Sequence, residues 1–259
     1  MIGSNIDFTL MLPAFLAGAL VLSTHVPLGQ EVLKRGIIFI DIAIAQITAL
    51  GVIAATIYGG ELAFWQIQVI AALSAISGAM LIHWLEHRCP HVLEALIGLL
   101  FILAASGGLL LASHAPDSEE LLNNLLVGQI LWVSYQQLLW VTLLYVPLLL
   151  VWFLFKGNQR PILFYFVFSL AVTASVQLVG IYLVFASLIL PALASRHIKQ
   201  VKNKLLLSYL VGLAGYILGL AASIIWDLPT GAITVWTLMV VVLISKPLFD
   251  RTTEKTLIE

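Results

Sequence analysis

Long charge-free runs divide the sequence into segments as long as a bilayer is thick. A helix of about 20 apolar residues crosses the hydrocarbon layer, and within lipid the backbone must satisfy its own hydrogen bonds. Asp41 is the one charged residue inside the second run. The pattern predicts membrane-spanning helices over residues 8–30, 36–60, 62–85, 95–116, 138–155, 161–195, 205–226 and 228–245.

Two of the charge-free windows are too long for one helix. The window 121–155 is rich in Asn and Gln in its first half, so we expect an interfacial amphipathic helix there, followed by one span over 138–155. The window 161–195 becomes less apolar near 178–181, which predicts either two short spans or a re-entrant turn. The fold class is therefore an all-α polytopic bundle with about eight or nine transmembrane helices, in one domain over 1–259.

The composition supports this interpretation. The chain is 61% hydrophobic and only 10% charged, whereas about 25% of residues are charged in soluble domains. The net charge is -1 and no basic stripe is present, so nothing indicates a nucleic-acid partner. The single cysteine, Cys89, excludes a framework of internal disulfides.

The basic residues indicate the orientation. All 12 Lys and Arg residues fall in alternate loops, and the intervening loops carry Glu61, the acidic group 117–120 and Asp227. Cytoplasmic loops of membrane proteins are enriched in Lys and Arg. We therefore expect a multi-pass protein of the bacterial inner membrane, with the N-terminus outside and the C-terminus in the cytoplasm.

Polar residues in the second predicted span are candidates for function, because ionisable groups within lipid are costly and usually functional. Asp41 lies six residues beyond Arg35, about 9 Å deeper along a helix. It either reaches the inner interface, where it can pair with Arg35, or binds a cation in a transport path. Thr48 shares its helical face, whereas Gln46 lies about 140° around the helix from Asp41.

The stretch HWLEH, residues 83–87, fits the H-x-x-E-H pattern of some zinc peptidases. Its two histidines share a helical face, and Glu86 could act as a base between them. It lies at the predicted cytoplasmic end of a span, however, and no third ligand stands at a distinctive spacing. We favour a helix end before Cys89 and Pro90, with a weak metal-binding patch as an intermediate possibility and an intramembrane zinc enzyme as a remote one.

Six stretches, taken in order, resemble the membrane-spanning permeases of bacterial zinc and manganese ABC importers. The fifth is the most specific, because it closely resembles the family pattern VGxLLxxxLLIxPAxxAR. The resemblance covers almost the whole chain. The stretches are VPLG at 26–29, FIDIAIAQITALG at 39–51, WLEHR with EALIG at 84–98, LLVGQILWVSYQQL at 125–138, VGIYLVFASLILPALASR at 179–196 and DLPTGA at 227–232.

The resemblance implies a homodimeric pore within membrane lipid, which imports zinc or manganese as cargo and holds no permanent cofactor. Its partners would be cytoplasmic ABC ATPase subunits, which hydrolyse the ATP, and a periplasmic or lipid-anchored metal-binding protein. The permease itself would not be an enzyme. The implied translocation path contains Asp41, Gln46, Thr48, Ser187 and Pro191, with Asp41 as a metal ligand. The implied ATPase contacts are Arg196, Lys199 and Lys202.

The chain departs from the family pattern at two places. The family carries Asp and His four residues apart in the second span. Alignment on Gly51 places Gln46 at the His position and Ile42 at the Asp position, and alignment on Asp41 places Ala45 at the His position. An amide oxygen is a poorer zinc ligand than an imidazole.

The second departure concerns coupling to ATP. The family's cytoplasmic segment that docks on the ATPase is replaced by the short loop KGNQRP at 156–161. Coupling could then use the basic loop 196–204. The alternative is a family-derived transporter or metal-homeostasis protein that is not coupled to an ATPase in the usual way.

Overall fold

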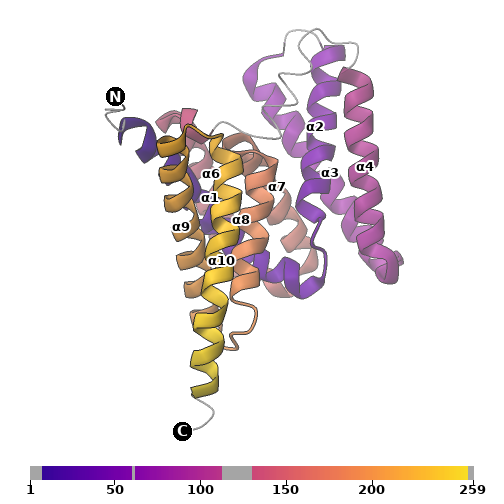
Figure 1. The fold of residues 1–259 in the computed structure, drawn as a ribbon. Helices are drawn as coiled ribbons and strands as arrows, with labels where there is room; N and C mark the ends of the chain where they lie inside the picture. The colour runs from indigo at the N-terminus through magenta and orange to yellow at the C-terminus, as the bar shows by residue number, and fades with distance from the viewer. Residues whose placement is uncertain (1–7, 60–61, 113–129, 256–259) are drawn as a thin grey trace.

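The computed structural model describes residues 8–59, 62–112 and 130–255. Nine α-helices lie in these ranges (Figure 1), and seven of them are long and apolar enough to cross a membrane. Two more apolar helical stretches are shorter, Ile181–Ala194 and Thr230–Ser245. The predicted all-α polytopic bundle is confirmed. Its helices are α1 (Phe8–Arg35), α2 (Ile40–Gly59), α3 (Phe64–Arg88), α4 (Leu93–Ala112), α6 (Tyr135–Leu154), α7 (Pro161–Val179), α8 (Ile181–Ala194), α9 (Val201–Trp226) and α10 (Thr230–Lys255).

The interfacial helix predicted in the first half of the window 121–155 lies only partly within the described residues. Residues 121–129 lie outside the described residues, and Ile130–Trp132 forms only a 3-10 turn, η2. The helix then begins at Tyr135, because Ser134 caps it. The Ser134 hydroxyl accepts a hydrogen bond from the Gln137 N–H at 3.2 Å, and the Gln137 side chain accepts one from the Ser134 N–H at 2.9 Å. Gln137 therefore belongs to the first turn of a span, where it satisfies a free helix-end N–H group.

The window 161–195 forms two helices joined by a single residue. Gly180 has a φ of 81°, a left-handed conformation that glycine adopts without strain, and it ends α7 and starts α8. The turn predicted near 178–181 is confirmed. Helix α8 has 14 residues and is therefore only about 21 Å long, less than the thickness of about 30 Å of the hydrocarbon core.

The helices form two neighbouring groups (Figure 1). Helices α2, α3 and α4 stand together, and α1, α8, α9 and α10 pack against one another on the other side. Helix α7 packs on α3 and also contacts α2 and α1, so it links the two groups. The burial of α7 agrees with this central position, because α7 is the most completely buried of the long apolar helices in the described structure.

Small residues allow close helix packing, and Gly212, Gly215 and Gly219 of α9 are examples. A methyl group on these glycines would overlap side chains of α1 or α10. The tightest approach involves Gly29 of the VPLG stretch, where a methyl group would overlap the carbonyl oxygen of Leu188 in α8. Two of the six family-like stretches therefore meet at this contact, and glycine lets their backbones approach closely.

We predict that Gly29→Ala lowers the thermal stability of the purified protein, because the Leu188 backbone cannot move aside as a flexible side chain can. Overpacking of this kind costs about 1–3 kcal/mol. Gly98→Ala in α4 is the matched control, since nothing lies within 4 Å of a methyl group there. The melting temperature of each variant is measured in detergent, by heating samples and recording the loss of the monodisperse peak in size-exclusion chromatography. Equal melting temperatures for Gly29→Ala and wild type would contradict the close contact.

Candidate functional site

A cavity of about 720 Å³ lies between the two groups of helices, and α2, α4, α8 and α10 line it. No charged residue is among its lining residues. Its polar side-chain groups are the Gln46 amide, the Tyr182 hydroxyl and the Trp236 indole N–H. Phe39 and Phe185 also line it and stack on each other, with ring centroids 6.1 Å apart. The sequence analysis did not single out these aromatic residues. Phe39 lies seven residues before Gln46, on the same helical face.

Asp41 and Gln46 of α2 point in different directions. Gln46 lines the cavity, whereas Asp41 does not. Asp41 is only 1% exposed, and neither of its carboxylate oxygens has a hydrogen-bond partner among the described residues. Gln46 is therefore the polar group that α2 presents to the cavity, and Asp41 is a buried carboxylate facing the interior of the bundle.

The other three predicted path residues lie in packed surroundings. The Thr48 hydroxyl donates to the Ile44 carbonyl at 2.8 Å. The Ser187 hydroxyl donates to the Leu183 carbonyl at 2.6 Å and shares a hydrogen bond with the Tyr216 hydroxyl. The Pro191 carbonyl accepts from the Ser208 hydroxyl at 3.0 Å. None of the three lines the cavity. The hydrogen bonds of Thr48 and Ser187 to carbonyls lie within α2 and α8. The hydrogen bonds of Ser187 and Pro191 to residues of α9 connect α8 to α9.

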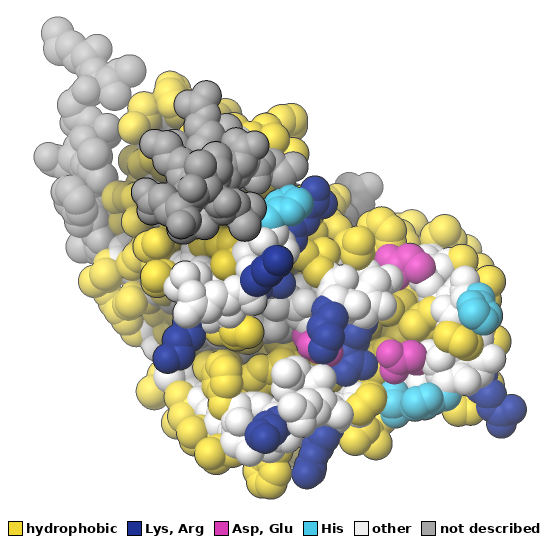
Figure 2. Space-filling model, turned by 90° about the horizontal axis from the view of Figure 1, so that it is seen from below, with side chains coloured by type: hydrophobic (Ala, Val, Ile, Leu, Met, Phe, Trp, Pro, Cys, Tyr) yellow, Lys and Arg dark blue, Asp and Glu magenta, His cyan; other side chains and the backbone are white. Residues whose placement is uncertain are grey.

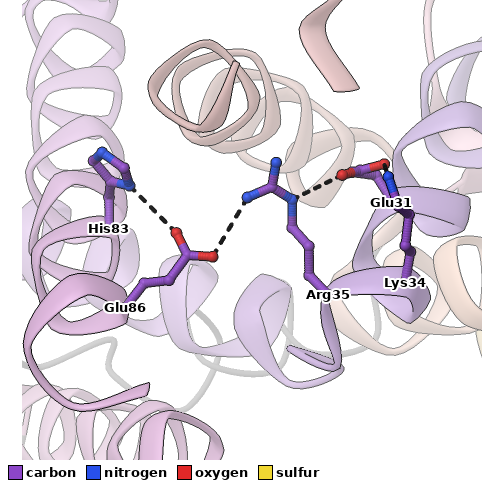
Figure 3. Close-up of polar contacts among 5 residues, drawn as sticks. All are labelled: Glu31, Lys34, Arg35, His83 and Glu86. Carbon is purple, nitrogen blue, oxygen red and sulfur yellow. Dashed lines mark hydrogen bonds and ion pairs between the residues drawn. The ribbon is translucent and has the colours of Figure 1, made fainter. Parts of the chain in front are cut away.

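A chain of charged groups connects α1 to α3 at one end of the bundle (Figure 3). Arg35 Nε lies 3.0 Å from Glu31 Oε1 and its Nη1 lies 3.4 Å from Glu86 Oε1. His83 Nδ1 lies 3.4 Å from the other oxygen of Glu86. The guanidinium also covers the ring of Phe164 in α7, 4.6 Å from its centroid. Arg35 is therefore engaged by glutamates, not by Asp41, the pairing that the sequence left open.

These contacts give the HWLEH stretch a structural role. Glu86 faces Arg35 and His83, and the rings of His83 and His87 meet edge to face with centroids 4.7 Å apart. Within the part of the chain that the structure describes, no group of three or more His, Cys, Asp and Glu residues is arranged to hold a metal ion. In the described structure Glu86 thus acts as the ion-pair partner that joins α3 to α1.

Basic side chains gather at the same end of the bundle (Figure 2). The loop between α8 and α9 contributes Arg196 and Lys199, and the first turn of α9 contributes Lys202; all three are exposed. Arg196 Nε donates a hydrogen bond to His197 Nε2 at 2.9 Å. Figure 2 thus shows Lys and Arg side chains of the described residues on one accessible face.

Comparison with known proteins assigns this architecture to a family. The model of the ABC 3 transport family matches residues 7–159 and 158–248. The chain belongs to the ABC 3 transport family. This confirms the family membership predicted from the six ordered stretches.

Relatives and solved structures agree with this assignment. The manganese transport system membrane protein MntC of Halalkalibacterium halodurans is 28% identical over 226 residues, which cover 79% of this chain and 75% of that protein. The structure of PsaBC from Streptococcus pneumoniae in complex with Fab has the same fold, with a TM-score of 0.74 at 22% identity over 92% of this chain and 91% of that one. An inward-facing structure of an ABC transporter assigned to the metal-chelate type has a TM-score of 0.62 at 19% identity, over 98% and 91% of the two chains.

The ABC 3 family match is divided at residues 158–159. This is the loop 156–161 in which the sequence predicts the loss of a cytoplasmic segment. Here α6 ends at Leu154, the 3-10 turn Gly157–Gln159 (η3) follows, and α7 starts at Pro161. Lys156 adopts a left-handed conformation with a φ of 51°, and Gly157 packs against the Trp152 ring. The connection is a tight turn held on the end of α6.

We predict that Glu86→Gln lowers stability by about 1 kcal/mol, because the half-buried Arg35 keeps its charge but loses one of its two carboxylate partners. The control is Asp227→Asn, which removes an exposed carboxylate from a left-handed position that asparagine tolerates. A double-mutant cycle with Arg35→Met, measured by thermal unfolding, isolates the pair. A coupling energy of zero would show that the pair does not hold α1 and α3 together.

Proposed function

We propose that this ABC 3 family member is the permease subunit of an importer for a divalent metal ion, with manganese as the preferred cargo. The family match over residues 7–248 carries the proposal. The similarity to a manganese transport membrane protein over most of both chains supports the cargo class. Membrane-spanning helices and a cavity between them supply the architecture that a permease needs.

The chemistry of the cavity supports manganese over zinc. Gln46 offers an amide oxygen where related permeases carry histidine, and carbonyl oxygens suit manganese whereas imidazole suits zinc. Weak oxygen ligands that replace part of the hydration shell let an ion enter and leave again. Asp41 does not line the cavity, so it is proposed as a separate metal ligand inside the bundle, supported by its two buried oxygens, which lack hydrogen-bond partners among the described residues. We propose that Thr48, Ser187 and Pro191 maintain the helices that line the path.

The wall of the cavity supports a homodimer. In a single chain the cavity wall is apolar apart from the Gln46 amide, the Tyr182 hydroxyl and the Trp236 indole N–H, which gives a hydrated divalent ion little compensation for lost water. A second copy of the chain facing the cavity would supply a second Gln46 and enclose the ion. Trp236 in α10 lines the cavity and is 70% exposed in the single chain, as expected for a surface that a partner covers.

The basic face is proposed to lie in the cytoplasm, together with the C-terminus, in accordance with the positive-inside rule. The exposed Arg196, Lys199 and Lys202 would then contact the ABC ATPase subunits. The metal-binding protein would deliver cargo at the opposite end. ATP hydrolysis would take place in the partner subunits, so that the permease supplies only the path.

A second candidate function is supported by the loop 156–161. The family match breaks there and the chain turns tightly from α6 into α7, leaving little room for a docking segment. Under this alternative the chain is a family-derived transporter or a metal-homeostasis protein whose activity does not depend on an ATPase in the usual way.

Reconstitution separates the two functions. The chain is co-expressed with candidate ATPase and metal-binding-protein subunits of the same source, purified, and inserted into proteoliposomes. We expect complexes with two copies of the permease, and manganese uptake that requires ATP and the binding protein. Zinc uptake should be slower. Uptake that proceeds equally without ATP and without the ATPase would support the uncoupled transporter and contradict the importer.

We further predict that Gln46→Ala slows manganese uptake about tenfold, since an oxygen ligand worth about 1.4 kcal/mol is lost from the path. Gln46→His should restore uptake and shift the preference toward zinc, because imidazole binds zinc well. Thr56→Ala is the control on the same helix, where the exposed hydroxyl bonds only to the Val52 carbonyl. If Gln46→Ala takes up manganese at the wild-type rate, the proposal that Gln46 is a ligand in the translocation path is contradicted.

A further inference from the structure

A second groove lies on the outside of the bundle, between α3, α6 and α7, with a volume of about 490 Å³. Helices α3 and α6 both pack on α7, and the groove runs between them. Its lining side chains are apolar with one exception, Arg160. Ile76 and Met80 come from α3, Val151 from α6 and Phe166 from α7. The groove therefore combines a long apolar wall with one positive charge.

Arg160 lies directly before the first residue of α7, whose first turn carries the Phe164 ring that Arg35 covers. Its side chain is exposed and makes no ion pair or hydrogen bond with any described side chain. Arg35, by contrast, is engaged by two glutamates. Lys156 adds a second exposed positive charge in the same loop, and the loop 156–161 contains no acidic residue. An anion that reaches this position meets cations whose charges are not already neutralised.

We propose that this groove binds an anionic phospholipid of the surrounding leaflet. An acyl chain lies along the apolar side chains of α3, α6 and α7, and the phosphate is bound by the Arg160 guanidinium. Two parallel N–H···O bonds from guanidinium to phosphate suit this geometry, and basic pockets between membrane helices bind anionic headgroups. A phospholipid supplies both the anionic group and the apolar chain that the groove requires. Its phosphate lies at the membrane interface, near Arg160, and its acyl chains lie in the hydrocarbon layer, beside the apolar side chains.

Binding here would connect parts of the bundle that few protein contacts join. The groove touches α3, which carries Glu86, and α7, which carries Phe164 beneath Arg35. A lipid in the groove would fill space between α3 and α6 and neutralise the charges of the α6–α7 loop. We therefore expect the lipid to raise the thermal stability of the protein as well as to remain bound during purification.

The test compares lipid binding to wild type and variants by native mass spectrometry in detergent. Titration uses phosphatidylglycerol, with phosphatidylcholine as the neutral lipid. We expect preferential binding of phosphatidylglycerol and an affinity about fivefold lower in Arg160→Ala, the effect of one basic residue at an anionic headgroup. Arg160→Lys should retain most of the affinity. Arg88→Ala is the matched control, because Arg88 is an exposed basic residue that does not line the groove.

A groove-filling variant tests the acyl chain separately. Ile76→Trp leaves Arg160 intact but occupies the apolar wall, so it should also weaken phosphatidylglycerol binding and remove the rise in melting temperature. Size-exclusion elution as for wild type establishes that each variant is folded. Equal affinity for the two lipids, or phosphatidylglycerol binding unchanged by both Arg160→Ala and Ile76→Trp, would overturn the proposal. A loss in Arg88→Ala equal to that in Arg160→Ala would show general charge attraction and overturn it as well.

Discussion

The absence of water in the hydrocarbon layer is the constraint on which the rest of this structure depends. Each backbone amide must find its partner within the chain, so the described segments are helices joined by short turns. Hydroxyl side chains follow the same rule, as Thr48 and Ser187 donate to carbonyls one turn earlier in their own helices. Asp41 does not follow this rule, because neither of its two buried carboxylate oxygens has a hydrogen-bond partner among the described residues. An unsatisfied carboxylate in such surroundings is costly, which is the physical ground for giving it a role in the path.

Charge is used differently at the basic end of the bundle. There Arg35 brings together two glutamates and the ring of Phe164, and in doing so it joins α1, α3 and α7. The same motif that suggested a zinc peptidase supplies one of those glutamates. A carboxylate that neutralises a half-buried guanidinium has a structural use, and this use explains the acidic residue of HWLEH without any reaction.

The two departures from the family pattern acquire distinct meanings in three dimensions. Gln46 lines the cavity, and alignment on Gly51 places it at the family's histidine position, so this departure falls on a surface that presents an amide instead of an imidazole. The shortened loop 156–161 instead changes the basic face, where it leaves a tight turn and two unpaired cations. Under the proposed function, the departure at Gln46 bears on which ion is transported. The departure at loop 156–161 bears on which molecules contact the protein at the membrane surface.

The sequence by itself determined the fold class, the approximate spans, the break near Gly180 and the family, because apolar length, glycine and ordered motifs are local signals. It also indicated, from helical periodicity alone, that Asp41 and Gln46 face different directions. Only the tertiary structure decided that Gln46 lines the cavity, that Arg35 pairs with Glu86 across 51 positions of sequence, and that Gly29 meets Leu188. Such contacts join residues far apart in the chain, and no local pattern specifies which helix packs against which. Helix α6 begins at Tyr135 rather than at the predicted residue 138, because Ser134 caps it and Gln137 belongs to its first turn.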